Sequence, residues 1–93
     1  SDQIEVKRGQ LAEQVLKNPV YAEAYGLIEK ELVRLWRESR DRDEREQLHQ
    51  LQRMLGKVQT LLESTMRSGQ VSAKDMQRKQ GLVERLGSRF QRD

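Results

Sequence analysis

Residues with catalytic potential are few in this sequence, and they do not converge. There is one histidine, His49, and no cysteine, so the usual nitrogen and sulfur ligands of a metal site are lacking. The carboxylate pairs Glu29/Glu31 and Glu44/Glu46 are each two residues apart, and such residues point to different faces of a helix. The serines have no neighbouring base, and the six glycines are too scattered for a phosphate-binding loop. We therefore predict no catalytic residue, no metal site and no cofactor, and a protein that is not an enzyme.

A basic stretch at the C-terminal end is the second chemical feature. The net charge is +3, and all of this excess falls in residues 70–93. If these residues are helical, Arg78, Arg85, Arg89 and Arg92 lie within about 60° of one another at about 100° per residue. Such a face could bind the phosphates of DNA, bind an acidic protein, or simply be solvated. Aromatic side chains that stack on bases are almost absent from it, so single-strand readout by stacking is not expected.

The single tryptophan, Trp36, follows Leu35 at the edge of an apolar helical face. Tryptophan is over-represented among the residues that dominate binding energy at protein interfaces. Trp36 is therefore a candidate anchor for a partner protein. The alternative is a boundary residue of the core that packs against the C-terminal helix.

Apolar spacing and capping residues predict the helices that position these side chains. Asn18 is a favourable N-cap, and Pro19 is favoured at the first helical position. We expect a short helix over residues 1–17, weakened by Gly9, and a longer helix over about 19–39. Both belong to a single all-α domain that spans the chain.

The second half of the chain contains two further start signals. Asp43 and Ser72 are each followed, three residues later, by an acidic residue, which is the spacing of a capping box. Gly69 is a typical residue for a helix end. We expect a helix over about 43–68 and a separate amphipathic basic helix in residues 70–93, part of which could be mobile.

The two central helices show matching apolar patterns. In an antiparallel hairpin, facing residues have sequence numbers with a constant sum. Five apolar pairs meet this condition: Tyr21 with Leu62, Tyr25 with Val58, Ile28 with Leu55, Leu32 with Leu51 and Leu35 with Leu48. Their midpoint falls at Asp41–Arg42, in a stretch without apolar residues. We therefore predict a helical hairpin over residues 19–69 with these ten residues as its core.

Two glycines lie almost opposite each other in this register. Gly26 and Gly56 are both predicted to be inside helices, where glycine costs about 1 kcal/mol relative to alanine. Either the backbones approach closely at this level, or another helix crosses there, or each glycine is merely tolerated. The sequence leaves these alternatives open.

The supply of apolar residues is small for a closed core. Hydrophobic residues make up 34% of the 93 residues and charged residues 35%, although Ala, Glu, Lys, Leu and Arg together give the composition of a long-helix protein. A chain of this length buries little more than about 60% of its surface even when well folded. We therefore expect another chain to complete part of the core, with a homo-oligomer as the result. No apolar run is long enough to cross a membrane, and we expect no membrane partner.

The central part of the chain resembles a group of small helical proteins of tailed bacteriophages and prophages. The resemblance spans roughly residues 11–70 and consists mainly of packing and capping residues: Leu16-Lys17-Asn18-Pro19, Ala24, Leu32, Trp36-Arg37-Glu38-Ser39, Arg45-Glu46-Gln47-Leu48, Leu62-Glu63-Ser64 and Ser68-Gly69. It implies a phage origin and a part in head assembly or DNA packaging, with the host cytoplasm or the virion as its location. It carries over no catalytic or ligand residue.

These observations lead to three hypotheses on function. The preferred one is a non-enzymatic, self-associating helical protein that acts through protein–protein contacts in phage particle assembly or packaging, with a phage structural protein as a possible partner. The second is a small packaging subunit that binds nucleic acid through its C-terminal basic face. The third is a small phage regulator or inhibitor of one host protein.

Overall fold

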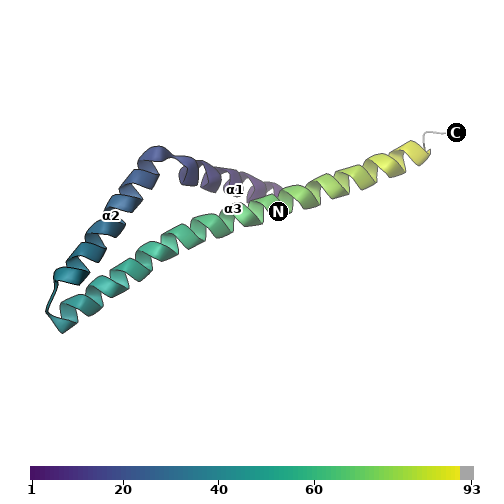
Figure 1. Cartoon of the computed structure of the whole chain (residues 1–93). Coiled ribbons are helices and arrows are strands. Elements are labelled where there is room, and N and C mark those ends of the chain that lie inside the picture. The colour runs from purple at the N-terminus through teal and green to yellow at the C-terminus, as the bar shows by residue number, and fades with distance from the viewer. Residues whose placement is uncertain (91–93) are drawn as a thin grey trace.

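The computed structural model describes residues 1–90, with the side chains of residues 1–88, and these form three helices without a strand. They are α1 (Asp2–Lys17), α2 (Pro19–Glu38) and α3 (Arg42–Phe90). The molecule is very extended, measuring 81 × 24 × 15 Å, and α3 runs along almost its full length (Figure 1). Its radius of gyration is 21.8 Å, whereas a compact domain of this length has a value of about 12 Å. The predicted all-α fold is confirmed at this level.

The α1–α2 boundary lies where the sequence predicts it. The side-chain oxygen of Asn18 accepts hydrogen bonds from the backbone nitrogens of Val20 and Tyr21, at 2.8 and 3.2 Å. Pro19 occupies the first position of α2, where its missing N–H leaves no helical hydrogen bond unmade. The chain bends at this point, so that α1 and α2 form two sides of an open triangle whose third side is α3 (Figure 1).

The turn between α2 and α3 is capped by Asp41 rather than by the predicted Asp43. The Asp41 carboxylate accepts hydrogen bonds from the backbone nitrogens of Asp43 and Glu44, at 2.8 and 3.1 Å. Asp43 is therefore already inside the first turn of α3, where its negative charge is favourable for the helix dipole. The cap moves by two residues because either aspartate can satisfy the free N–H groups.

α3 is one continuous helix, which corrects the prediction of a separate C-terminal helix. It passes without a break through Gly69 and Ser72, and no described glycine has a positive φ. Glycine inside a helix costs only about 1 kcal/mol relative to alanine. At Gly69 the missing side chain allows a close helix contact instead of a helix end. Ser72 is buried in this contact and caps no helix.

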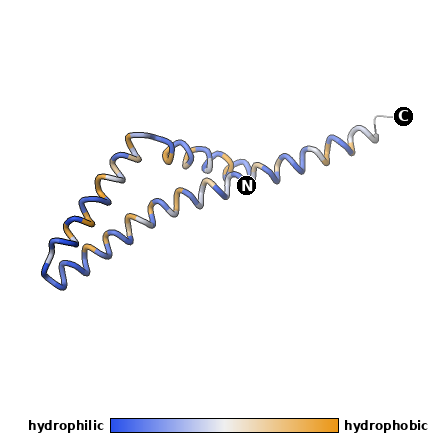
Figure 2. The backbone as a smooth tube through the Cα atoms, viewed as in Figure 1, coloured by the Kyte–Doolittle hydropathy of each residue, from blue (hydrophilic) through white to orange (hydrophobic). Residues whose placement is uncertain are grey.

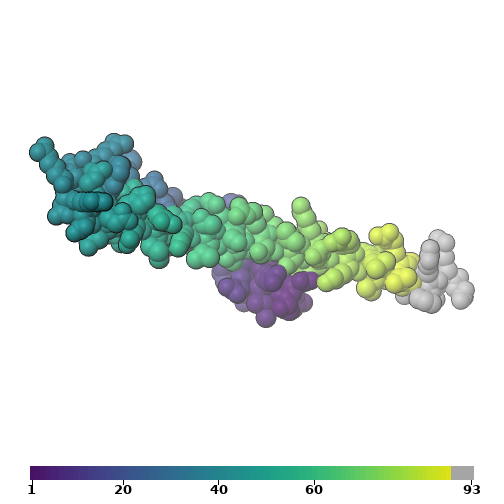
Figure 3. Space-filling view, turned by 90° about the horizontal axis from the view of Figure 1, so that it is seen from below, coloured from purple at the N-terminus to yellow at the C-terminus, as the bar shows by residue number. Residues whose placement is uncertain are grey.

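α1 packs tightly on the middle of α3 through small residues. A Cβ atom placed on Gly9 would lie 2.7 Å from the Cα of Gly69, and a Cβ on Gly69 would lie 2.7 Å from the Cα of Gly9. Ala12 is buried beside this crossing. The sequence predicts that Gly9 weakens α1; in the structure α1 continues through Gly9, and the missing side chain lets it touch α3. In the space-filling view from below, α1 is seated directly against α3 (Figure 3).

The contact between α2 and α3 is made by large residues and is looser. Tyr21 and Tyr25 pack with ring centroids 6.0 Å apart, and the Tyr25 hydroxyl donates a 2.9 Å hydrogen bond to the carbonyl oxygen of Leu55. A Cβ atom on either Gly26 or Gly56 would meet no atom within 4 Å. These two glycines are therefore not a point of close approach, and the crossing lies at Gly9 and Gly69.

The chain by itself encloses little apolar surface. Within the described residues no side chain is fully buried, and the buried hydrophobic residues are Ala12 and Leu48. Apolar positions recur along all three helices instead of gathering at one place (Figure 2). The accessible surface is 8063 Å², about 2,400 Å² more than the roughly 5,600 Å² expected for a folded monomer of this mass.

Candidate functional site

The predicted core residues differ widely in burial. Leu48 is buried, and six of the ten are half-buried: Tyr21, Tyr25, Leu32, Leu35, Leu55 and Leu62. The remaining three, Ile28, Leu51 and Val58, are 51%, 52% and 46% exposed. The structure thus lacks the closed core that the apolar pairing predicts, because α2 diverges from α3 beyond the turn (Figure 1) and these three residues remain open to solvent.

The three exposed core residues belong to a larger apolar surface. We define the apolar face as Val20, Leu27 and Ile28 of α2 with Leu51, Met54, Val58 and Leu61 of α3, all between 46% and 71% exposed. In α3 these positions are spaced three or four residues apart, as on one side of a helix. The face therefore consists of exposed apolar positions on two neighbouring helices.

The two halves of the apolar face lie on one side of the molecule. At about 100° per residue, the centre of each half lies roughly 80° round its helix from the covered core residues, such as Leu32 in α2 and Leu55 in α3. Each half lies at a lower helical angle than the covered residues of the same helix. The chain runs toward the turn in α2 and away from it in α3 (Figure 1). In an antiparallel pair, equal displacement of this kind places both halves on the same side.

Trp36 is held at the turn by Arg45. The guanidinium carbon of Arg45 lies 4.3 Å from the centroid of the Trp36 ring, within the range of a cation–π interaction. The same guanidinium donates hydrogen bonds to the carbonyl oxygens of Trp36 and Ser39, at 2.6 and 3.1 Å. These carbonyls lie at the end of α2, where a cation is favourable for the helix dipole. Trp36 therefore packs against the first turn of α3, not against its C-terminal part.

A shallow hollow lies beside this tryptophan. Its volume is about 420 Å³, and it is lined by Trp36, Arg40, Arg42, Arg45, Glu46 and His49. His49 is exposed, and no carboxylate, cysteine or second histidine of the described chain forms with it a cluster that could hold a metal ion. The hollow offers positive charge and one aromatic ring.

The arginines of the predicted basic face are only partly described. Arg78 and Arg85 are exposed on α3, and Arg78 forms an ion pair with Asp75. Arg89 lies in α3, but its side chain is outside the described residues, as is the whole of Arg92. Since α3 is helical through Phe90, the backbone positions of Arg78, Arg85 and Arg89 share one side of the helix.

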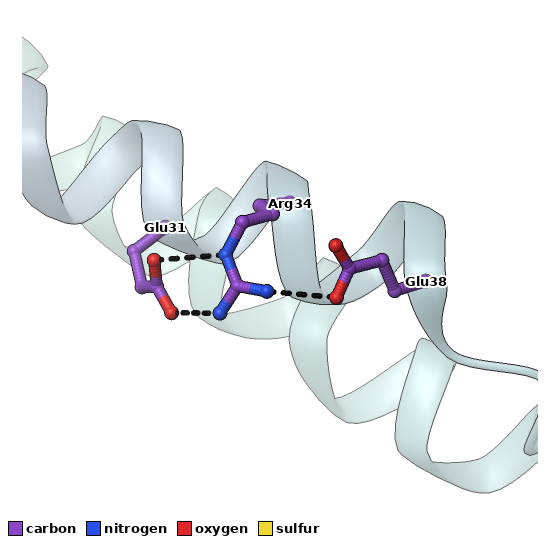
Figure 4. Close-up of polar contacts among 3 residues, drawn as sticks. All are labelled: Glu31, Arg34 and Glu38. Atoms are coloured by element: carbon purple, nitrogen blue, oxygen red, sulfur yellow. Dashed lines mark hydrogen bonds and ion pairs between the residues drawn. The ribbon is translucent and has the colours of Figure 1, made fainter.

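Charges on α2 are paired within the helix, on the same arc as Val20 and Leu27. Arg34 lies between Glu31 and Glu38 and bonds to both, at 2.5 and 2.7 Å (Figure 4). The hydrogen bond from Arg34 lowers the pKa of Glu31, and the two carboxylates raise the pKa of Arg34. The group is exposed and spaced three and four residues apart, which is typical of a solvated helix surface.

Comparison with known proteins gives no relative from which a site could be transferred. Neither a protein-family model, nor a curated protein, nor a solved structure matches the chain. Within the described residues no helix is both long and apolar enough to cross a membrane. The strongest candidate for a functional surface is therefore the apolar face.

Three residues of this face, Ile28, Leu51 and Val58, were predicted to lie in the hairpin core, and the other four were given no role. The signal was present: Leu51, Met54, Val58 and Leu61 form a second periodic apolar stripe next to Leu48, Leu55 and Leu62. Two adjacent stripes on one helix indicate that it packs against more than one neighbour. This pattern is visible in the sequence alone.

Proposed function

We propose that the chain is a non-enzymatic protein that self-associates through the apolar face and acts through protein–protein contacts. The observation that carries this proposal is the exposure of seven large apolar side chains on one side of the α2–α3 pair. Large contiguous apolar patches are rare on monomeric soluble proteins and mark interaction sites. A second copy of the chain is the occupant that best fits this surface.

The area argument favours a second copy. Each chain exposes about 2,400 Å² more than a compact monomer of its mass. Obligate homodimer interfaces bury about 2,000–5,000 Å² in total, which two such chains can supply. Covering the apolar face would also enclose Ile28, Leu51 and Val58, so the hairpin core predicted from the sequence would be completed between two protomers.

A part in phage head assembly or DNA packaging is the biological setting we propose for this activity. It rests on the resemblance of residues 11–70 to small phage proteins and on the suitability of an elongated, self-associating helical protein for particle assembly. The inhibitor of a host protein is a less favoured setting, since one partner would have to cover an apolar face of this extent in place of a second copy.

The test is the oligomeric mass of the parent and of two variants, measured by light scattering and sedimentation. Leu51→Gln with Val58→Gln removes apolar contacts from the face, whereas Val71→Gln with Leu82→Gln makes the same exchange at exposed residues outside it. We expect an oligomeric parent, a monomeric face variant and an unchanged control. The parent should also melt at a temperature that rises with protein concentration, because assembly stabilises only the folded chain. A parent that is monomeric at high concentration would overturn the proposal.

A further inference from the structure

The continuous helix α3 brings together basic residues that are far apart in the sequence. We define the basic ridge as Arg42, Arg53, Arg67, Lys74, Arg78 and Arg85, all of which are exposed. At about 100° per residue they lie within roughly 60° of one another, although they span almost the whole helix. No acidic residue of α3 falls within this arc. The ridge exists only because α3 does not end at Gly69.

The ridge faces away from the rest of the molecule. Residues of α3 that α1 and α2 cover, such as Leu48, Leu55 and Gly69, lie roughly 110–180° round the helix from it. The apolar face of α3 lies about 150° away. Self-association through the apolar face would therefore leave the ridge accessible on the outside of the assembly.

The ridge lacks the pairing found elsewhere on the surface. On α2, Arg34 is enclosed by two glutamates, and Lys17 of α1 bonds to Glu13 at 2.6 Å. Among the six described side chains of the ridge, by contrast, Arg78 alone makes an ion pair. Lys74 and Arg78 are four residues apart, a spacing at which like charges destabilise a helix. Stability of the isolated helix therefore does not account for a row of a single sign.

We propose that the basic ridge binds the phosphate backbone of nucleic acid. From Arg42 to Arg85 it extends over about 65 Å at 1.5 Å per residue, a length comparable to about 19 base pairs at 3.4 Å each. Arginine and lysine neutralise phosphates without reading bases, and the ridge contains no aromatic residue for stacking. Binding is therefore electrostatic and independent of sequence. This site includes Arg78 and Arg85 but extends far beyond the C-terminal segment.

A salt titration with fluorescently labelled 30-nucleotide DNA, as a duplex and as a single strand, tests the proposal. The ridge variant is Arg53→Gln, Arg67→Gln, Lys74→Gln. The control variant is Lys7→Gln, Lys30→Gln, Arg37→Gln, which removes the same charge from exposed residues of α1 and α2. Helicity by circular dichroism and oligomeric mass are compared for all proteins. A third variant, Arg53→Lys with Arg67→Lys, preserves the charge.

We expect the parent to bind DNA with an affinity that falls steeply as salt rises. The ridge variant should lose about three units of the slope of log affinity against log salt, and at least about tenfold in affinity at about 100 mM salt. The control and the lysine variant should bind like the parent. Preference for the duplex or the single strand identifies which form of the phosphate backbone the ridge follows. No binding by the parent at about 50 mM salt would overturn the proposal, as would equal losses in the ridge and control variants. Binding to polyglutamate but not to DNA would also overturn it and assign the ridge to an acidic protein.

Discussion

The two helix contacts along α3 are built in opposite ways. At the α1–α3 crossing, Gly9 and Gly69 bring the backbones together, and the Ser72 hydroxyl donates a 2.5 Å hydrogen bond to the Glu5 carboxylate. Between α2 and α3, the contact is made by large residues such as Tyr25 and Leu55, and Ile28 stays more than half exposed. The first contact buries its residues within one chain. The second contains the apolar residues of a core, but several of them remain exposed to solvent.

Polar groups at the two contacts show the same difference. At the crossing, Lys79 reaches Asp2 at 3.1 Å, which adds an ion pair to the Glu5–Ser72 hydrogen bond. Between α2 and α3, the Tyr21 hydroxyl and the Gln52 amide nitrogen are shielded from solvent and have no hydrogen-bond partner among the described residues. Such groups cost free energy where they stay unpaired. The polar groups of the α1–α3 contact are thus paired within one chain, whereas these two groups between α2 and α3 are left without a partner in the described part of the chain.

The largest expected effect concerns the glycines. Gly69→Ala places a methyl group against the backbone of α1 and should lower the free energy of unfolding by about 1–3 kcal/mol. Gly26→Ala and Gly56→Ala meet open space and should instead raise it by about 0.5–1 kcal/mol each. Urea unfolding at a fixed protein concentration measures all three. A stabilising effect of Gly69→Ala would show that the crossing is not tight.

A smaller effect is expected at the turn that joins the two helices of the looser contact. Arg45→Gln removes the cation–π interaction with Trp36 and both hydrogen bonds to the end of α2. We expect a loss of about 1–2 kcal/mol, because charge-assisted hydrogen bonds are stronger than neutral ones. Trp36 fluorescence should shift toward that of a more solvated indole. Arg40→Gln is the control, and an equal loss there would mean that only the net charge matters.

The smallest effect is expected inside the looser contact. Burial, followed by the nearby Glu29, raises the pKa of Tyr25. The stabilising contribution of its protonated hydroxyl is therefore present below the usual tyrosine pKa of about 10 and is lost as the pH rises through the higher value of the folded protein. Absorbance titration of the parent should show a tyrosine that ionises late, and Tyr25→Phe should remove it. Identical titrations of the late phase in both proteins would contradict the Tyr25–Leu55 contact.

Features that depend on neighbouring residues in the sequence, such as helix caps, could be predicted. Features that depend on contacts between distant residues could not. Asn18 and Pro19 define the start of α2 from the sequence alone, because capping depends on neighbouring residues. Gly69 could not be assigned in this way, since the same residue suits a helix end and a close crossing. Its role depends on Gly9, which is sixty residues away in the sequence and carries no sign of the pairing.

The apolar face and the basic ridge also depend on contacts or alignments between residues that are distant in the sequence. Periodic spacing identifies the apolar residues of α2 and α3 but not which of them are covered, because coverage depends on the separation of the helices. The sequence also predicts a local basic face of Arg78, Arg85, Arg89 and Arg92. The alignment of Arg78 and Arg85 with Arg42 and Arg53 became visible only when the predicted break at Gly69 proved to be absent.

The unbroken course of α3 also constrains how the length of this protein can vary. Each residue inserted between Leu61 and Lys74 would turn one end of the helix relative to the other by about 100°. One or two extra residues would thus move Arg78 and Arg85 out of line with Arg42, and those inserted before Gly69 would also separate it from Gly9. Seven residues add nearly two whole turns and shift the phase by only about 20°. We therefore expect the basic ridge to survive length changes after Gly69 mainly as whole heptads, while the Gly9–Gly69 contact fixes the length of α3 before it.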